Sequence, residues 1–131
     1  MEDNEDDIDL TLRAFRSHGF STPIVIARDG QEALHQLLDA RSPVPALVLL
    51  DLKLPFVDGI GVLKRMRSEE RTRMVPVVIL TSSNEDADVA NSYRSGANSY
   101  VRKPVDFGHF SDAARQLGVY WLVLNQPPPE P

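Results

Sequence analysis

The chain has 131 residues and a formal net charge of −5, with 42% hydrophobic and 25% charged residues. This length suits one domain, and the composition is typical of a soluble globular protein. The acidic balance argues against nucleic-acid binding, and the absence of cysteine excludes disulfides, thiolate metal sites and cysteine nucleophiles. No apolar run approaches the roughly 18 residues of a membrane span, and no signal segment opens the chain. We therefore expect a cytoplasmic protein.

Helical and strand patterns alternate from the start of the chain. Residues 4–18 have helical apolar spacing, with Asn4 as a plausible N-cap and Gly19 as a plausible stop. The pattern predicts a strand over 23–27, after which Asp29 can cap a second helix. The first quarter is thus expected to run helix, strand, helix.

The alternation continues to the end of the chain. Residues 46–51 form an apolar run without alternation, as in a strand buried on both faces. The remaining expected elements are a helix capped by Asp58, an apolar strand over 75–81, a helix opening at Asn84 or Glu85 and stopping at Gly96, a short strand over 99–101, and a last helix from Phe107 to about Leu124.

This order predicts an α/β fold with an open, doubly wound parallel sheet and helices on both faces. Residues 1–125 are expected to form the domain, and the proline-rich residues 126–131 an extended tail. In such sheets the functional site lies at the carboxyl ends of the strands.

Polar residues stand at three of these strand ends and at the start of the chain. Asp51 ends one strand, Thr81 ends the next, Lys103 follows the last, and Glu2-Asp3 precedes the first helix. Each has an ordinary explanation alone: a turn residue, a helix cap, a surface cation and a solvated acid run. Their joint placement at one sheet edge favours a functional site.

This set of residue types indicates phosphoryl transfer to a carboxylate. Clustered acids repel one another unless a hard cation such as Mg²⁺ lies among them. The metal and Lys103 would neutralise charge on the transferred group, and Thr81 would donate a hydrogen bond to one of its oxygens. Positioning and electrostatics supply most of the catalysis in such transfers.

The ordered motifs resemble the receiver domain of two-component response regulators, a flavodoxin-like (αβ)5 fold. They are Glu2-Asp3-Asn4, Leu49-Leu50-Asp51-Leu52-Lys53-Leu54-Pro55 with Asp58-Gly59, Leu80-Thr81-Ser82 and Tyr100-Val101-Arg102-Lys103-Pro104. The acidic opening, Asn98-Ser99-Tyr100 and the ending with Tyr120-Trp121 and Asn125 are similar to single-domain regulators paired with bacterial phytochromes.

The resemblance implies a role for each acid. Asp51 would accept a phosphoryl group from a phosphohistidine on a sensor histidine kinase. Asp3 and Asp51 would ligate Mg²⁺ directly, together with the backbone carbonyl of Lys53, and Glu2 would act through water.

The resemblance also implies a conformational switch. Thr81 and Lys103 would bind the phosphoryl oxygens, and Tyr100 would turn inward as Thr81 moves toward the phosphate. Without the motif, Tyr100 would be interpreted as a core aromatic on an edge strand. The Lys103–Pro104 bond is expected to be cis.

The chain departs from this family at its start. Receivers carry a buried apolar strand before the acid pair, in the middle of the sheet between 24–27 and 46–51. Met1 stands where the last residue of that strand would be. We therefore expect a sheet without its first strand, with unpaired backbone groups, and a natural product that starts further upstream.

Three functions remain open on the sequence. The leading one is a phosphorylation-switched signalling module without an output domain, which catalyses only its own phosphoryl transfer and dephosphorylation. A phosphatase with an aspartyl-phosphate intermediate is disfavoured, because Lys53 stands where such enzymes have a second aspartate. A protein-interaction module that never uses phosphate would fail to form an acyl phosphate with a small phosphodonor and Mg²⁺.

The last predicted helix also indicates a partner. Residues 119–124 are apolar on every side of the helix, so docking on the sheet leaves an apolar patch exposed. We expect a homodimer through the 107–124 helix, with folding back under the proline-rich tail as the alternative.

Overall fold

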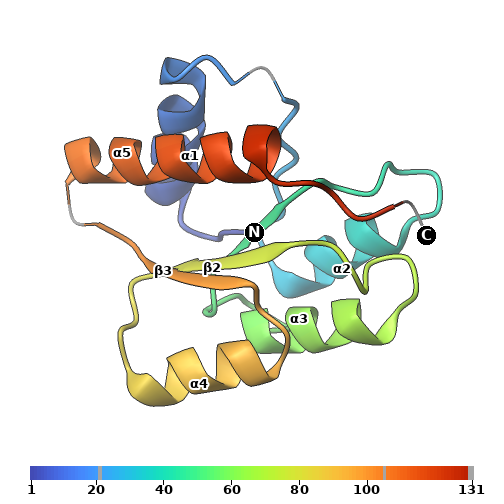
Figure 1. Cartoon of the computed structure of the whole chain (residues 1–131). Coiled ribbons are helices and arrows are strands. Elements are labelled where there is room, and N and C mark those ends of the chain that lie inside the picture. The colour runs from blue at the N-terminus through green and yellow to red at the C-terminus, as the bar shows by residue number, and fades with distance from the viewer. Residues whose placement is uncertain (21, 105, 130–131) are drawn as a thin grey trace.

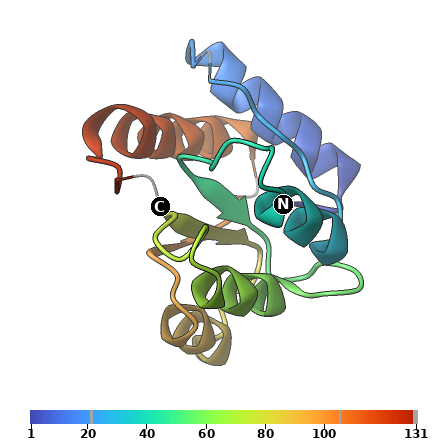
Figure 2. The same ribbon diagram turned by 90° about the vertical axis from the view of Figure 1, so that its right-hand side faces the viewer.

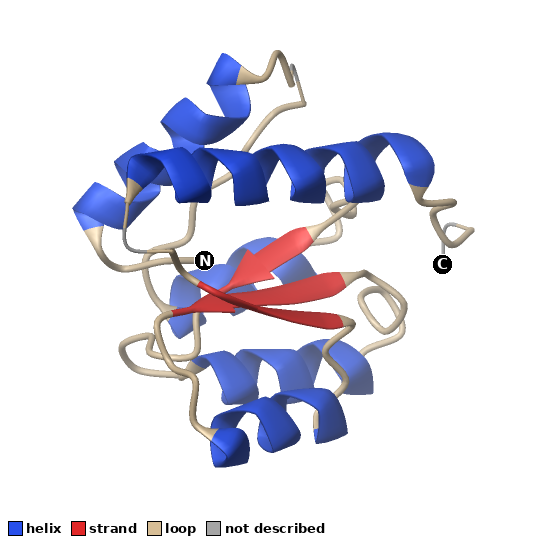
Figure 3. Cartoon of the chain, turned by 60° about the vertical axis from the view of Figure 1, so that its left-hand side comes forward, coloured by secondary structure: helices blue, strands red, loops and turns tan. Residues whose placement is uncertain are grey.

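A three-stranded parallel sheet forms the centre of the computed structural model, which describes residues 1–20, 22–104 and 106–129 (Figures 1 and 3). The strands lie in the order β1–β2–β3 and comprise Val48–Leu50, Val77–Thr81 and Ser99–Arg102. Each pair of neighbours is parallel, with Leu50 opposite Ile79 and Ile79 opposite Tyr100. The three predicted strands after residue 45 are therefore confirmed; the first two are shorter than predicted, and the third is one residue longer.

Helices cover both faces of this sheet (Figures 1 and 2). On one face lie α1 (Glu5–Ser17) and α5 (Phe107–Gly118), and on the other lie α2 (Gly30–Leu38), α3 (Gly59–Ser68) and α4 (Asp86–Arg94). Connected parallel strands need such crossover helices, so the predicted doubly wound α/β fold is confirmed.

Caps define the helix ends at the predicted residues. The side chains of Asn4, Asp29 and Asp58 each accept a hydrogen bond from a backbone N–H three residues later, at 3.1, 2.7 and 2.8 Å. Gly19 and Gly96 follow α1 and α4 with φ of 77° and 108°, a left-handed conformation that glycine adopts without steric cost. Local sequence therefore determines where these helices begin and end.

The apolar core lies on both sides of β2, all five residues of which are buried. Leu50, Leu63 and Ile79 belong to the cluster beneath α2 and α3, whereas Phe15 and Phe110 belong to the cluster beneath α1 and α5. Burial on both faces explains why the sequence of β2 is apolar without alternation.

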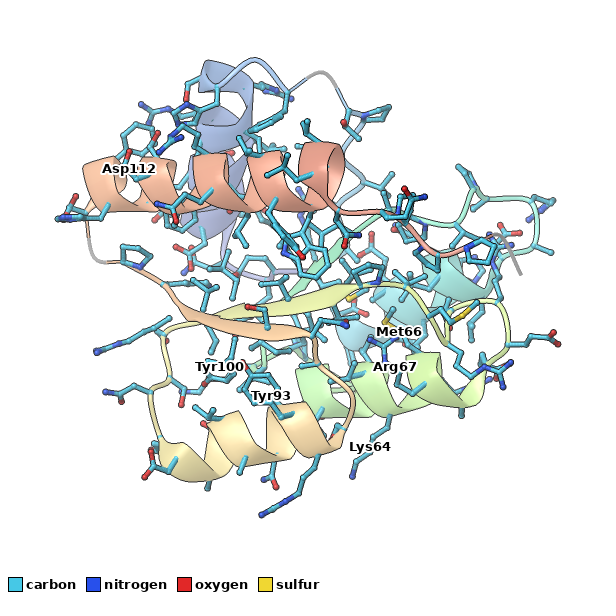
Figure 4. All side chains as sticks on the ribbon, viewed as in Figure 1. Lys64, Met66, Arg67, Tyr93, Tyr100 and Asp112 are labelled. Atoms are coloured by element: carbon cyan, nitrogen blue, oxygen red, sulfur yellow. The ribbon has the colours of Figure 1, made fainter. Side chains whose placement is uncertain are left out.

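Arg67, which sequence analysis did not single out, connects α3 to the loops that precede β2 and β3 (Figure 4). Its guanidinium donates to the carbonyl of Gly96 at 2.8 and 3.0 Å and to that of Val75 at 2.9 Å. Burial lowers the pKa of Arg67 below its ordinary value. The side chain thus supplies hydrogen bonds to carbonyls at the amino edge of the sheet.

The prediction of a strand over 23–27 is wrong. This segment is extended but is not part of the sheet, and Val25 is 74% exposed. The start of the chain lies between this segment and β1, and the N–H of Glu2 donates to the carbonyl of Ala27 at 2.9 Å. Only a ladder of several such bonds makes a strand, and residues 23–26 find no backbone partner of this kind among the described residues.

Met1 itself pairs with β1 in the pattern of a parallel strand. Its ammonium donates to the carbonyl of Leu49 at 2.6 Å, and its carbonyl accepts from the N–H of Asp51 at 3.1 Å. Met1 and Glu2 therefore lie between the 23–27 segment and β1 and bond to both. This agrees with the expectation of a sheet that lacks a full first strand.

The last helix changes character before its predicted end. After α5, the backbone continues as a π-helix, η1 (Val119–Leu124), in which no residue is buried. Phe110, Ala114 and Leu117 of α5 are buried against the sheet. None of the helices in the described part of the chain has the length and apolar character needed to span a membrane.

Candidate functional site

Asp51 lies directly after β1, with a side chain that is 10% exposed. Its Oδ1 accepts hydrogen bonds from Thr81 Oγ1 at 3.0 Å and from the backbone N–H of Lys53 at 3.2 Å. Its Oδ2 accepts from Lys103 Nζ at 2.8 Å. The three residues predicted from separate strand ends thus meet at one carboxylate.

The parallel sheet explains this convergence. Thr81 is the last residue of β2, and Lys103 follows β3, where its N–H donates to the carbonyl of Thr81 at 2.7 Å. Asp51 is held in line with them because its N–H bonds to Met1. Carboxyl ends of adjacent parallel strands meet at one edge, so distance along the chain is not an obstacle.

The ammonium of Lys103 joins three carboxylates. Besides Asp51, it contacts Asp7 Oδ2 at 2.8 Å and Glu2 Oε2. Asp7 comes from the first turn of α1, and sequence analysis did not select it. The acid run from Glu2 to Asp7 contains five carboxylates, and helical spacing alone does not show which of them faces the sheet edge.

The pKa values of these groups respond to burial and to one another. Burial acts to lower the pKa of Lys103, but hydrogen bonds to Asp51, Asp7 and Glu2 outweigh it and raise that pKa above its ordinary value. Burial acts to raise the pKa of Asp51, but the bonds from Lys103 and Lys53 keep it below the ordinary range. Burial raises the pKa of Glu2. Lys103 is therefore a fixed cation and Asp51 an ionised acceptor at neutral pH.

The predicted metal ligands are only partly brought together. Asp3 is exposed, whereas Glu2 and Asp7 point to Lys103. Within the described ranges, no group of three or more histidine or acidic residues is arranged to hold a metal ion. The donor chemistry nevertheless suits a hard divalent cation, because three carboxylates around one ammonium leave uncompensated negative charge.

Tyr100 points toward the α4 side of the sheet (Figure 4). Its hydroxyl donates to the carbonyl of Ser83 at 2.9 Å, and its partly buried ring packs against the cluster beneath α2 and α3. Thr81 is fully buried and bonded to Asp51. In this structure the Tyr100 ring is therefore packed on the α4 side of the sheet, and the hydroxyl of Thr81 is bonded to the carboxylate of Asp51.

The expectation of a cis Lys103–Pro104 bond is wrong. The described residues contain no cis peptide bond. The trans form of a bond before proline is lower in energy by about 0.5–1 kcal/mol, and Lys103 already reaches Asp51, Asp7 and Glu2 in that form.

Comparison with known proteins identifies relatives over nearly the whole chain. The family model described as Response regulator receiver domain matches residues 1–115. The probable methanogenesis regulatory protein FilR2 of Methanothrix harundinacea is 41% identical over 98% of this chain and 84% of its own length. The response regulator Rcp1 of Synechocystis sp. is 31% identical over 93% of this chain and 86% of its own length.

Solved structures show the same likeness. The phosphorylated cyanobacterial phytochrome response regulator RcpA has a TM-score of 0.92 and 32% identity, over 98% of this chain and 95% of its own. The Mn²⁺-bound form of Rcp1 has a TM-score of 0.90 and 30% identity, over 98% of this chain and 96% of its own. The domain limit at residue 125 stays a prediction, because the family match ends within α5.

Proposed function

Because this chain belongs to the response regulator receiver domain family, we propose that Asp51 accepts a phosphoryl group from a phosphohistidine of a sensor histidine kinase. The observation that carries this proposal is the set of donors on one ionised carboxylate. Thr81 Oγ1 and Lys103 Nζ lie 3.0 and 2.8 Å from its two oxygens. No other acid among the described residues has both a hydroxyl and an ammonium partner.

The transfer follows from these positions. An oxygen of Asp51 attacks phosphorus in line with the imidazole nitrogen, the P–O bond forms as the P–N bond breaks, and the imidazole leaves with the electron pair and takes a proton. Lys103 and Thr81 then exchange contacts with the carboxylate for contacts with the phosphoryl oxygens. The chain's own contribution is orientation and charge neutralisation.

Mg²⁺ fits this site through its oxygen donors. Asp51, the acids of the chain start and the carbonyl of Lys53 would hold the ion, which would neutralise charge that develops on the phosphoryl group. Support comes from the Mn²⁺-bound form of Rcp1. Glu2 and Asp7 now bind Lys103, so metal binding requires that the lysine contacts be redistributed.

The signal would leave the site through Thr81 and Tyr100. Thr81 Oγ1 bonds to Asp51, and the hydroxyl of Tyr100 bonds to the carbonyl of Ser83, two residues beyond Thr81. A phosphoryl group on Asp51 adds negative charge that Lys103 and Thr81 bind, which stabilises the inward position of Tyr100. The response passes to a partner protein or to a second copy of this chain.

A bacterial phytochrome is the proposed kinase. The proposal rests on the likeness to RcpA, which is a phytochrome response regulator. A second copy is the proposed assembly partner, since η1 exposes the apolar side chains of Val119, Tyr120, Val123 and Leu124.

The decisive experiment replaces Asp51 with asparagine. With acetyl phosphate and Mg²⁺, or with a phosphorylated bacteriophytochrome kinase, the wild-type chain should gain one acid-labile phosphate and the variant none. Asp86→Asn, a change at an exposed acid of α4, is the matched control and should be labelled normally.

Other outcomes decide between the alternatives. Label that persists in Asp51→Asn would contradict the assignment of the acceptor. A wild-type chain that takes phosphate from no donor would instead be an interaction module, and steady release of phosphate from an ester substrate would indicate a phosphatase.

A further inference from the structure

The loop between β1 and α3 holds Phe56 in an unfavourable backbone conformation. Its φ is 68°, the one positive φ at a non-glycine residue in the described part of the chain. For a bulky side chain this left-handed conformation is an outlier, since Cβ crowds the backbone. Strain of this kind persists where the surrounding structure enforces it, and it concentrates at functional sites.

Burial of the Phe56 side chain does not compensate for this strain. The Phe56 residue is 85% exposed, so its ring gains little from burial. Glycine would adopt the same φ without steric cost. The phenylalanine is therefore unfavourable for the isolated chain in two ways, through its backbone and through its exposed ring.

Hydrogen bonds and packing hold the loop around Phe56 in place. The N–H of Gly30 donates to the carbonyl of Pro55 at 3.2 Å, and the N–H of Gly59 donates to that of Leu52 at 2.9 Å. A Cβ on Gly30 would lie 1.8 Å from the carbonyl oxygen of Val57, so α2 packs directly on the loop. The fold thus holds the ring outward in a defined place.

That place adjoins the phosphoryl acceptor. Phe56 is five residues after Asp51, which limits their separation to about 18 Å, and Gly59 returns the loop to the backbone of Asp51. A macromolecule that brings a phosphoryl group to Asp51 must approach this edge of the sheet. Phe56 is therefore an exposed aromatic residue in a loop at the same edge of the sheet.

We propose that Phe56 is a docking residue for the protein that donates the phosphoryl group, with its ring entering an apolar depression beside the phosphohistidine. The inference rests on the proposed function and deepens it. Aromatic side chains that become fully buried at an interface commonly dominate its affinity. Phe56 takes no part in the chemistry, and small phosphodonors should not need it.

The test compares two donors on the variant Phe56→Gly, which removes the ring and relieves the φ. Acetyl phosphate with Mg²⁺ should label it at the wild-type rate, and its melting temperature should be unchanged or higher. Transfer from the phosphorylated bacteriophytochrome kinase, or from whichever phosphorylated histidine kinase labels the wild-type chain fastest, should fall about ten-fold or more in kcat/KM, mainly through KM.

Met74→Ala is the matched control. Met74 is 51% exposed and lies in the loop before β2, at the opposite edge of the sheet, so kinase transfer should be unaffected. Phe56→Leu, which keeps an apolar side chain, should retain part of the kinase-dependent rate.

Three results would overturn the docking role. Unchanged transfer from the kinase to Phe56→Gly would show that the ring makes no productive contact. An equal loss with acetyl phosphate would show that the loop conformation serves Asp51 and not a partner. If acetyl phosphate but no kinase labels the wild-type chain, a kinase is not its phosphodonor, and Phe56 has no kinase to contact. Failure of the wild-type chain with both donors would count against the proposed function itself.

Discussion

Lys103 is the residue on which the site's charge balance depends. Its side chain is 10% exposed, and its ammonium forms ion pairs with Glu2, Asp7 and Asp51. Removing one partner of a buried ion pair leaves the other charge uncompensated. The resulting loss of folding stability is larger than the stability that the intact pair contributes. We therefore expect the lysine to stabilise the unphosphorylated chain, in addition to its proposed role in phosphoryl transfer.

Replacing Lys103 with alanine should destabilise the chain by about 2 kcal/mol at pH 7. Urea unfolding measures the loss, with Lys64→Ala at an exposed position of α3 as the control. Because the remaining carboxylates repel one another, their pKa values rise in the folded variant. The deficit should therefore shrink as the pH falls through the carboxylate range, and Mg²⁺ should reduce it at pH 7. A deficit that is independent of pH and of Mg²⁺ would contradict this account.

At the scale of elements, Met1 and Glu2 connect β1 to the 23–27 segment through backbone hydrogen bonds. The amine of Met1 donates to Leu49 and its carbonyl accepts from Asp51, while Glu2 bonds to Ala27 on the other side. This arrangement places a charged amine among buried backbone groups. Burial lowers its pKa from 8.0 to about 6.

Stability should therefore depend on pH between about 6 and 8. Below pH 6 both folded and unfolded chains are protonated, and the full cost of the buried charge is present. As the pH rises from 6 to 8, the folded chain loses its proton first, so the unfolded chain binds more protons and the free energy of unfolding rises, by about 2 kcal/mol.

Acetylation of the amine isolates this effect, because an acetylated Met1 keeps an N–H donor for Leu49 but carries no charge. The difference in unfolding free energy between the unmodified and acetylated chains should narrow across the same pH window, as followed by denaturant unfolding. A constant difference would show that the amine is not buried in solution.

For the whole molecule, an apolar surface remains at the end of the chain. Four residues of η1 are substantially exposed, and Val123 and Leu124 reach 68% each. Phe110, Ala114 and Leu117 already dock α5 on the sheet, so this face cannot also bury η1. A twofold dimer would pair the patch with itself.

Light scattering tests the dimer. The wild-type chain should have twice the monomer mass at tens of micromolar, and replacing Tyr120 and Leu124 with glutamate should halve it. Met74→Glu, in the loop before β2 and outside α5 and η1, should leave the mass unchanged. A monomeric wild-type chain, phosphorylated or not, would refute the dimer, and a dimeric double variant would place the interface elsewhere.

Local signals in the sequence determined most of the architecture and the main site. Asn4, Asp29 and Asp58 cap helices where they were expected to, because capping needs only the next three residues. Asp51, Thr81 and Lys103 could be grouped in advance, because parallel strands bring their carboxyl ends to one edge.

Tertiary structure decided the features that depend on a distant partner. The 23–27 segment has strand-like residues, but without a neighbouring ladder it stays outside the sheet, and Ile24 and Val25 are exposed. Asp7 could not be chosen from its acid run until α1 was placed against Lys103. The positive φ of Phe56 likewise lies in a loop on which α2 packs. Each depends on contacts between segments distant in sequence, which local periodicity does not encode.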